Sequence, residues 1–281
     1  MTVTELSSVP SLAPLFAKAA FTGPLRRGGV LPETTLRVGG QSVDRNHLAA
    51  YDRVCGLRYG DVLPATYLHL LAFPLGVRLM TDRGFPFPLI GLVHVANTIT
   101  VHRPARVGEV FDISATTADL RPHPAGTQFD VVASADVAGE TVWSSRSTYL
   151  RRGKGGGEKK AASELEPQRG TVSQVRVSPG VAKKYAAISG DRNPIHVSTL
   201  GAKAFGFPSV IAHGMWLQAR SLANLEGRLP QSYRVDVAFK TPVLLPSVIA
   251  MATASTDTGW ELDVRSVKSG KPHLSGNVIT L

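Results

Sequence analysis

The chain has 281 residues, enough for one large domain or two domains of ordinary size. Its single cysteine, Cys55, excludes an intramolecular disulfide framework and fits a reducing compartment. The net charge of +10 favours polyanionic partners, but no CxxC, RNP-like or helix-turn-helix signature accompanies the basic residues, so we expect no nucleic-acid binding.

The chain shows no sign of export or of membrane insertion. Its first residues lack a basic region followed by an apolar run, which a signal peptide needs. The most apolar window, Tyr67 to Met80, contains His69, Pro74 and Arg78, and it is shorter than the roughly 20 residues that span a bilayer. We therefore expect no integral membrane segment and a soluble, cytoplasmic protein.

The first half contains one helix candidate followed by several strand candidates. The helix candidate is "LPATYLHLLAFPLGVRLM", which ends at Met80. Alternating apolar and polar residues then begin at Thr98 and recur at 127–137 and 141–150. This alternation, interrupted by turn residues, predicts antiparallel strands joined by hairpin-like turns.

Residues 151–170 are rich in glycine and charge and contain almost no large apolar side chain. This composition predicts a flexible connector between a first part, residues 1–150, and a second part, residues 171–281. The second part repeats the order of the first, with a helix candidate at Ser209 to Leu225 and strand candidates after it, beginning at Asp236.

One long helix followed by several strands, occurring twice, predicts an α+β fold. We expect a curled antiparallel sheet around a long helix, duplicated within one chain. The two sheets can then pair edge to edge, which covers exposed edges and makes the chain its own pseudo-dimer. Whether two chains also form a homodimer is left open.

A candidate acid and base follow a short helix in the second half. "SPGVAKKYAAIS" predicts a helix capped by Ser178 and ended by Gly190, and "DRNPIH", Asp191 to His196, comes next. Because Pro194 prevents the helix from continuing, we expect this stretch to lie in a loop. Such a loop can aim the carboxylate and the imidazole at one water molecule. The alternative is a polar turn in which Asp191 or Asn193 bonds the backbone.

His213 and Gly214 open the apolar helix candidate of the second half. A glycine there lets a substrate approach the backbone, and a helix N-terminus presents free N–H groups, which is the geometry of an oxyanion hole. The alternative is that Gly214 only allows close packing. Asp191, His196 and His213 could also be three metal ligands, but their spacing is unusual for that purpose, so we expect no metal.

These motifs resemble a known family. "YAAISGDRNPIHVSTLGA", beginning at Tyr185, and the following "FGFPSVIAHGM" resemble the MaoC-like (R)-specific enoyl-thioester hydratases. The resemblance is close from Gln174 to Leu281. The first half resembles the degenerate N-terminal repeat of double-hotdog members, including the mycobacterial 3-hydroxyacyl-thioester dehydratases. The resemblance implies a double-hotdog fold, in which each long helix is wrapped by an antiparallel sheet.

The same resemblance implies a catalytic pair, Asp191 and His196, with the Gly214 amide as oxyanion donor. We add Asn193 as a supporting residue that orients the loop or the water. The implied reaction is the reversible hydration of trans-2-enoyl thioesters to (3R)-hydroxyacyl thioesters, the work of a hydro-lyase. No cofactor is expected, because coenzyme A or acyl carrier protein carries the substrate, and the basic chain suits both carriers. Alternatives are a thioesterase or a non-catalytic acyl-thioester-binding protein.

The first half lacks the catalytic motif. Tyr51 and Gly56 match Tyr185 and Gly190, but no Asp-x-Asn-Pro-x-His follows Gly56. Thr66-Tyr67 stands where His-Gly would be expected, and the segment between the glycine and the helix is shorter by about ten residues than in the second half. We therefore expect a structural first half whose shortened wall leaves room for a medium or long acyl chain.

Overall fold

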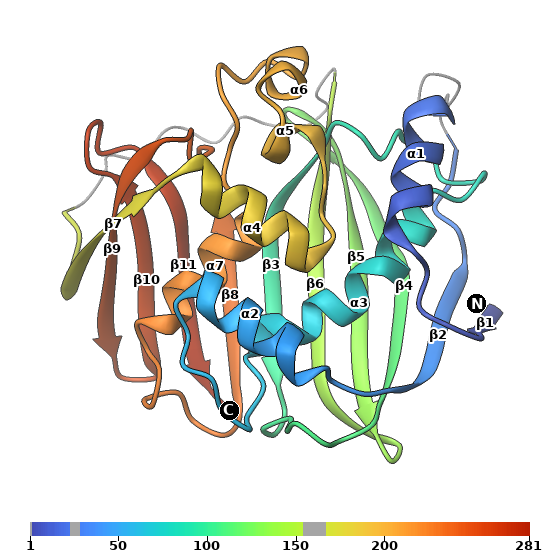
Figure 1. Ribbon diagram of the computed structural model, residues 1–281, viewed down its shortest axis with the longest axis horizontal. Helices are drawn as coiled ribbons and strands as arrows, with labels where there is room; N and C mark the ends of the chain where they lie inside the picture. Colours follow the sequence, from blue (N-terminus) through green and yellow to red (C-terminus); the bar gives the residue numbers. More distant parts are fainter. Residues whose placement is uncertain (1, 23–28, 154–166) are drawn as a thin grey trace.

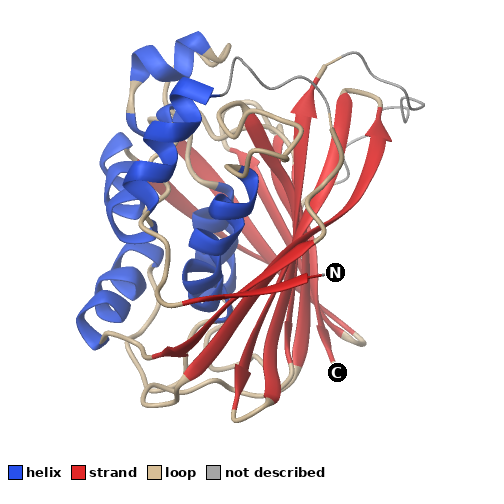
Figure 2. Cartoon of the chain, turned by 90° about the vertical axis from the view of Figure 1, so that its right-hand side faces the viewer, coloured by secondary structure: helices blue, strands red, loops and turns tan. Residues whose placement is uncertain are grey.

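The structure, a computed structural model, describes residues 2–22, 29–153 and 167–281. Eleven strands form one continuous sheet, and the helices gather on one face of it (Figure 1). Figure 2, turned by 90°, shows the sheet curling around this helical layer. None of the helices in these three ranges has both the length and the apolar character needed to cross a membrane.

From β2 and β7 onward the two halves follow the same order of strand, helices and four strands, except that α5 and α6 are inserted in the second half and that β1 and α1 precede β2 in the first. The first half contains β1 (Thr2–Leu6), α1 (Leu12–Thr22), β2 (Thr34–Gln41), α2 (Arg45–Cys55), α3 (Ala65–Met80), β3 (Leu92–Val101), β4 (Phe111–His123), β5 (Gly126–Val137) and β6 (Glu140–Arg152). The second half contains β7 (Thr171–Val177), α4 (Pro179–Ser189), α5 (Pro194–Val197), α6 (Thr199–Ala204), α7 (Gly214–Ala223), β8 (Tyr233–Phe239), β9 (Ser247–Thr256), β10 (Gly259–Ser266) and β11 (Pro272–Thr280).

The sheet consists of two five-stranded parts that meet in the middle. One part has the order β2-β4-β5-β6-β3 and the other β8-β11-β10-β9-β7, and β1 adds to the outer edge of the first. Strands β3 and β8 pair antiparallel at the centre, where Thr98 lies opposite Asp236. The Thr98 hydroxyl donates to the Asp236 carboxylate at 2.7 Å. Since these residues begin the two similar segments of the sequence, an approximate twofold axis passes through this pair. The predicted edge-to-edge pairing is confirmed.

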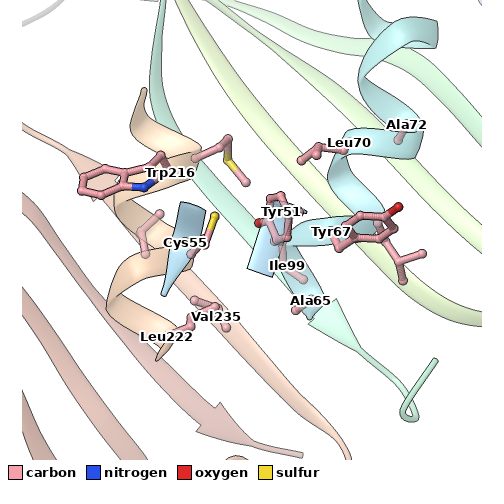
Figure 3. Close-up of a cluster of buried hydrophobic side chains, with 14 of the residues drawn as sticks. Tyr51, Cys55, Ala65, Tyr67, Leu70, Ala72, Ile99, Trp216, Leu222 and Val235 are labelled. Atoms are coloured by element: carbon pink, nitrogen blue, oxygen red, sulfur yellow. The ribbon is translucent and has the colours of Figure 1, made fainter. Parts of the chain in front are cut away.

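The helices of the two halves share one hydrophobic core beneath the sheet. Trp216 of α7 donates its indole N–H to the Val54 carbonyl of α2 at 2.9 Å, and Trp143 of β6 donates to the Ala65 carbonyl of α3 at 2.8 Å. Each bond satisfies a polar atom that burial would otherwise leave unpaired. Figure 3 shows side chains from α2, α3 and α7 meeting those of β3 and β8: Tyr51, Cys55, Tyr67, Trp216, Ile99 and Val235.

The helix expected at Ser209 to Leu225 is shorter than predicted, since α7 starts only at Gly214 and ends at Ala223. The preceding residues are extended, because Ile211 forms a β-bridge with Leu244 and the Ala212 amide donates to the Val243 carbonyl. Tertiary pairing here overrides the helical spacing of the apolar residues.

The connector expected at residues 151–170 lies mostly outside the described residues, which omit 154–166. Strand β6 extends through Arg152 and β7 begins at Thr171. The division into residues 1–150 and 171–281 stays a prediction.

Asp52 of α2 predicts an unusual pH dependence of stability. It is 2% exposed, and neither carboxylate oxygen has a hydrogen-bond partner among the described residues. Burial, and secondarily the charge of Glu226, raise the pKa of Asp52 to about 7 from 3.8. The Asp52 carboxyl group therefore binds its proton more tightly in the folded chain than in the unfolded chain. Protonation stabilises the fold fully below about pH 4, and this stabilisation is lost as the pH rises through about 7.

We therefore expect Asp52→Asn to raise the free energy of unfolding at pH 8, by at most the roughly 4 kcal/mol that the rise in pKa from 3.8 to about 7 represents, and to flatten its pH dependence between pH 4 and 7. Urea unfolding at several pH values measures both effects. Asp61→Asn is a suitable control, because that side chain is 72% exposed. An unchanged pH slope in Asp52→Asn would contradict the explanation.

Candidate active site

The candidate catalytic loop begins where α4 ends. Ser178 precedes Pro179, the first residue of the helix, and Gly190 ends it in the left-handed conformation with φ of 72°. This boundary was predicted correctly. Gly56 ends α2 with the same φ, so the two halves share this turn before their sequences diverge.

The loop is more regular than predicted, because Pro194 begins the short helix α5 rather than an irregular segment. Proline is favoured at the first helical position, where its ring presets φ and its missing N–H is not needed. Asn193 caps this helix, its side-chain oxygen accepting from the Ile195 amide at 3.4 Å. Asp191 accepts from the Asn193 amide at 3.2 Å. The polar turn considered above is therefore present alongside the acid and the base.

The structure brings Asp191, His196 and His213 together. Each of the three residues has one nitrogen or oxygen atom that could bind a metal, and these three atoms lie within 4.8 Å of one another. The rings of His196 and His213 stack with their centroids 3.7 Å apart. Both rings are buried, whereas Asp191 is half-buried. The carboxylate and the imidazole of His196 are thus close enough to act on one small molecule.

His196 is held as a neutral ring with one defined lone pair. Its Nδ1 donates to the Ile211 carbonyl at 2.8 Å, so Nε2 is the nitrogen that can accept a proton. Burial lowers the pKa of His196, and the nearby Asp191 and the Ile211 carbonyl partly oppose this shift. A neutral imidazole beside a carboxylate is suited to general base catalysis.

His213 links the loop to helix α7. Its Nε2 donates to the backbone carbonyl of Asp191 at 3.0 Å, and its ring supports that of His196. Burial, and secondarily His196, lower its pKa well below the usual value. Each histidine has one ring nitrogen bonded to a carbonyl, so each could offer only the other to a metal. That no metal binds here stays a prediction.

Gly214 is the first residue of α7, where an amide has no acceptor within the helix. A Cβ atom at this position would lie 3.1 Å from the ring of Phe239. The structure therefore shows the close packing that glycine allows, and it also places Gly214 in the wall of the cavity that Asp191 and His196 line.

This cavity has a volume of about 300 Å³, and both halves of the chain line it. The second half contributes all four predicted site residues: Asp191, Asn193, His196 and Gly214. The first half contributes polar side chains that the sequence analysis missed: His69, His94 and Tyr149. No local motif marks these three, since they come from α3, β3 and β6.

The first half differs from the second in two details that the sequence comparison misjudged. The residue before the long helix is Pro64 in α3 and His213 in α7, so Pro64-Ala65, not Thr66-Tyr67, occupies the His-Gly position. The connection before the helix spans residues 56–64 in the first half and 190–213 in the second, which is 15 residues longer rather than about ten. The additional residues include the candidate catalytic loop, α5 and α6.

Comparison with known proteins agrees with this geometry. The family model of the MaoC-like domain matches residues 160–277. The chain is 38% identical over 279 residues to the 3-hydroxyacyl-thioester dehydratase X of Mycobacterium tuberculosis, covering 98% of this chain and 99% of that protein. The chain belongs to the MaoC-like dehydratase family. The predicted family is thus confirmed, and so is the prediction of a hydro-lyase at the level of the family.

Solved structures of MaoC-like dehydratases confirm the predicted double-hotdog fold. The crystal structure of HtdX from M. tuberculosis is 37% identical, covers 88% of this chain and 100% of its own, and superposes with a TM-score of 0.79. A MaoC-like dehydratase from Phytophthora capsici is 17% identical with a TM-score of 0.72, and the match covers 90% of this chain and 96% of that one. An acyl-ACP thioesterase from Bacteroides thetaiotaomicron, 12% identical with a TM-score of 0.53, shares the fold alone.

Proposed function

We propose that this protein catalyses the reversible hydration of trans-2-enoyl thioesters to (3R)-hydroxyacyl thioesters. The observation that carries the proposal is the convergence of Asp191, His196 and the amide end of α7 on one largely apolar cavity. The extensive identity to a dehydratase of 3-hydroxyacyl thioesters supports it. The (3R) configuration rests on the family resemblance.

In this mechanism a water molecule lies between the Asp191 carboxylate and His196 Nε2. The pair takes a proton from the water as its oxygen bonds to C3, and a proton is returned to C2. Negative charge develops on the thioester oxygen, and the Gly214 amide donates to that oxygen. Asn193 keeps the loop in place by capping α5. The reverse sequence eliminates water from a 3-hydroxyacyl thioester.

The chemistry calls for no cofactor beyond the carrier of the acyl group. Coenzyme A and acyl carrier protein both bring negative charge, and Arg152 and Lys240 in the cavity wall offer positive charge to either. The choice of carrier, the cytoplasmic location and a homodimer stay predictions.

The decisive measurement follows the loss of the enoyl-thioester absorbance with crotonyl-CoA and trans-2-dodecenoyl-CoA, together with a thiol assay. Hydration lowers the absorbance without releasing coenzyme A. Thiol release at the same rate would instead indicate a thioesterase, and binding without turnover of either substrate would indicate a non-catalytic acyl-binding protein.

We expect substrates of eight to twelve carbons to exceed crotonyl-CoA in kcat/KM by about tenfold or more. Each buried methylene contributes about 0.8 kcal/mol, and the first half lines the cavity with large apolar side chains such as Phe73, Met80 and Leu92. Steady-state kinetics across the chain-length series measures the effect. Equal or better turnover of the crotonyl thioester would contradict the expected preference.

A further inference from the structure

Helix α1 lies ahead of the repeated unit and contributes to the cavity wall. It packs against α3 (Figure 1), and in the described part of the second half no helix precedes β7. Its apolar face has the spacing of an amphipathic helix and packs onto a cluster of buried apolar side chains in the first half: Leu12, Leu15, Phe16 and Ala19. Among the described residues that line the cavity, Phe16 alone comes from ahead of β2.

This helix contacts both the candidate catalytic loop and the apolar part of the cavity. A Cβ atom on Gly190, the residue before Asp191, would collide with the Leu12 side chain, so the start of α1 packs on the turn that opens the loop. Phe16 follows one helical turn later, about 6 Å further along the axis. It belongs to the same apolar cluster as four other side chains of the cavity wall: Phe73, Met80, Leu89 and Leu92.

A series of ring contacts connects the position of the oxyanion donor to this apolar cluster. Phe239, the ring beside Gly214, packs edge-on against His94 with centroids 5.1 Å apart. His94 stacks on Tyr149 at 4.8 Å, and Tyr149 stacks on Phe129 at 5.6 Å within the cluster. Because the cluster is apolar, it suits the alkyl chain rather than the charged carrier. An acyl chain bound through its thioester oxygen at the Gly214 amide therefore extends along these rings toward the cluster.

We propose, building on the proposed hydration of enoyl thioesters, that Phe16 closes the apolar end of the cavity and sets the upper limit of acyl-chain length. Each methylene group that enters an apolar wall strengthens binding by about fourfold. Once the chain reaches the phenyl ring, a further methylene group finds no space, because a packed wall resists overfilling. Phe16 is then a specificity-determining residue that lies outside both repeats.

Chain length tests this proposal directly. For the wild type we expect kcat/KM to rise from crotonyl-CoA to trans-2-dodecenoyl-CoA and to gain little in trans-2-hexadecenoyl-CoA. Phe16→Ala removes the ring, so two or more further methylene groups find space, and the ratio of kcat/KM for hexadecenoyl- over dodecenoyl-CoA should rise by about tenfold or more. Phe16→Trp should lower the ratio for dodecenoyl- over octenoyl-CoA. Crotonyl-CoA is too short to reach the ring, so Phe16→Ala should hydrate it about as well as the wild type.

Phe87→Ala is the matched control. Phe87 stacks with Phe129 at 6.0 Å and packs edge-on against Phe85 at 5.9 Å in the same cluster, but it is not among the described residues that line the cavity. The control removes the same side chain from the same cluster, and it should lower stability without changing the length profile. Thermal unfolding compares the two variants. Should Phe16→Ala not fold, Phe16→Leu is the milder change and should shift the same ratio in the same direction.

The proposal is overturned if Phe16→Ala and Phe16→Leu leave the ratio unchanged, or if Phe87→Ala shifts it equally, since the shift would then follow from lost packing. Failure of the proposed function looks different, because the wild type would then hydrate no enoyl thioester of any length. The affinities of dodecanoyl- and hexadecanoyl-CoA, measured by calorimetry, still test the role of Phe16 in that case. Phe16→Ala should favour the longer chain, and an unchanged ratio of the two dissociation constants would contradict that role.

Discussion

Asp191→Asn and His196→Gln should each lower kcat for hydration by about 10²- to 10⁴-fold, the usual contribution of a general acid or base. Asparagine keeps an oxygen that can accept from the Asn193 amide but lacks a basic carboxylate. Glutamine at position 196 removes the Nε2 lone pair that faces the water. The enoyl-thioester absorbance assay measures both losses.

Two substitutions of the same residue types provide controls. Asp257 lies in an exposed turn, and exposed His102 directly follows β3, so Asp257→Asn and His102→Gln should both retain nearly full activity. The double variant of Asp191 and His196 should be scarcely less active than either single variant, because the two groups act on one water molecule. Full activity in either single variant would refute the assigned pair.

Gly214→Pro should lower kcat by about 10²- to 10³-fold, the usual effect of removing one oxyanion donor. Proline has no N–H to offer the thioester oxygen, yet it suits this position because Gly214 is the first residue of α7. The preceding His213 has φ of −69° and ψ of 137°, which a residue before proline readily adopts. The helix should therefore form while the donor is lost.

Gly214→Ala is the matched control, because it adds a Cβ atom near Phe239 but keeps the amide. The comparison of kcat between the alanine and proline variants isolates the N–H group, and thermal unfolding of both shows whether α7 is intact. Equal kcat in the two variants would mean that Gly214 serves close packing and that another group holds the thioester oxygen.

The features predicted correctly depend on residues close together in the chain. Helix α4 begins at Pro179 and ends at Gly190 as expected, although the Ser178 side chain makes no capping hydrogen bond. Asp191 and His196, only five residues apart, lie close together, and their catalytic role stays a prediction. Gly56 and Gly190 end corresponding helices, and only Gly190 is followed by the Asp-Arg-Asn-Pro motif. The sequence alone therefore determined the α+β duplication and the loop that carries the acid and the base.

Only the tertiary structure decided how the cavity is completed. The start of α7 at Gly214 depends on the bridge between Ile211 and Leu244, and the tautomer of His196 depends on the Ile211 carbonyl. In the cavity wall, His94 of β3 lies opposite Tyr149 of β6 and packs against Phe239 of β8, a residue 145 positions further along the chain. Helical or strand periodicity reports which face of an element is buried, whereas pairing between distant strands decides which buried side chains share one cavity.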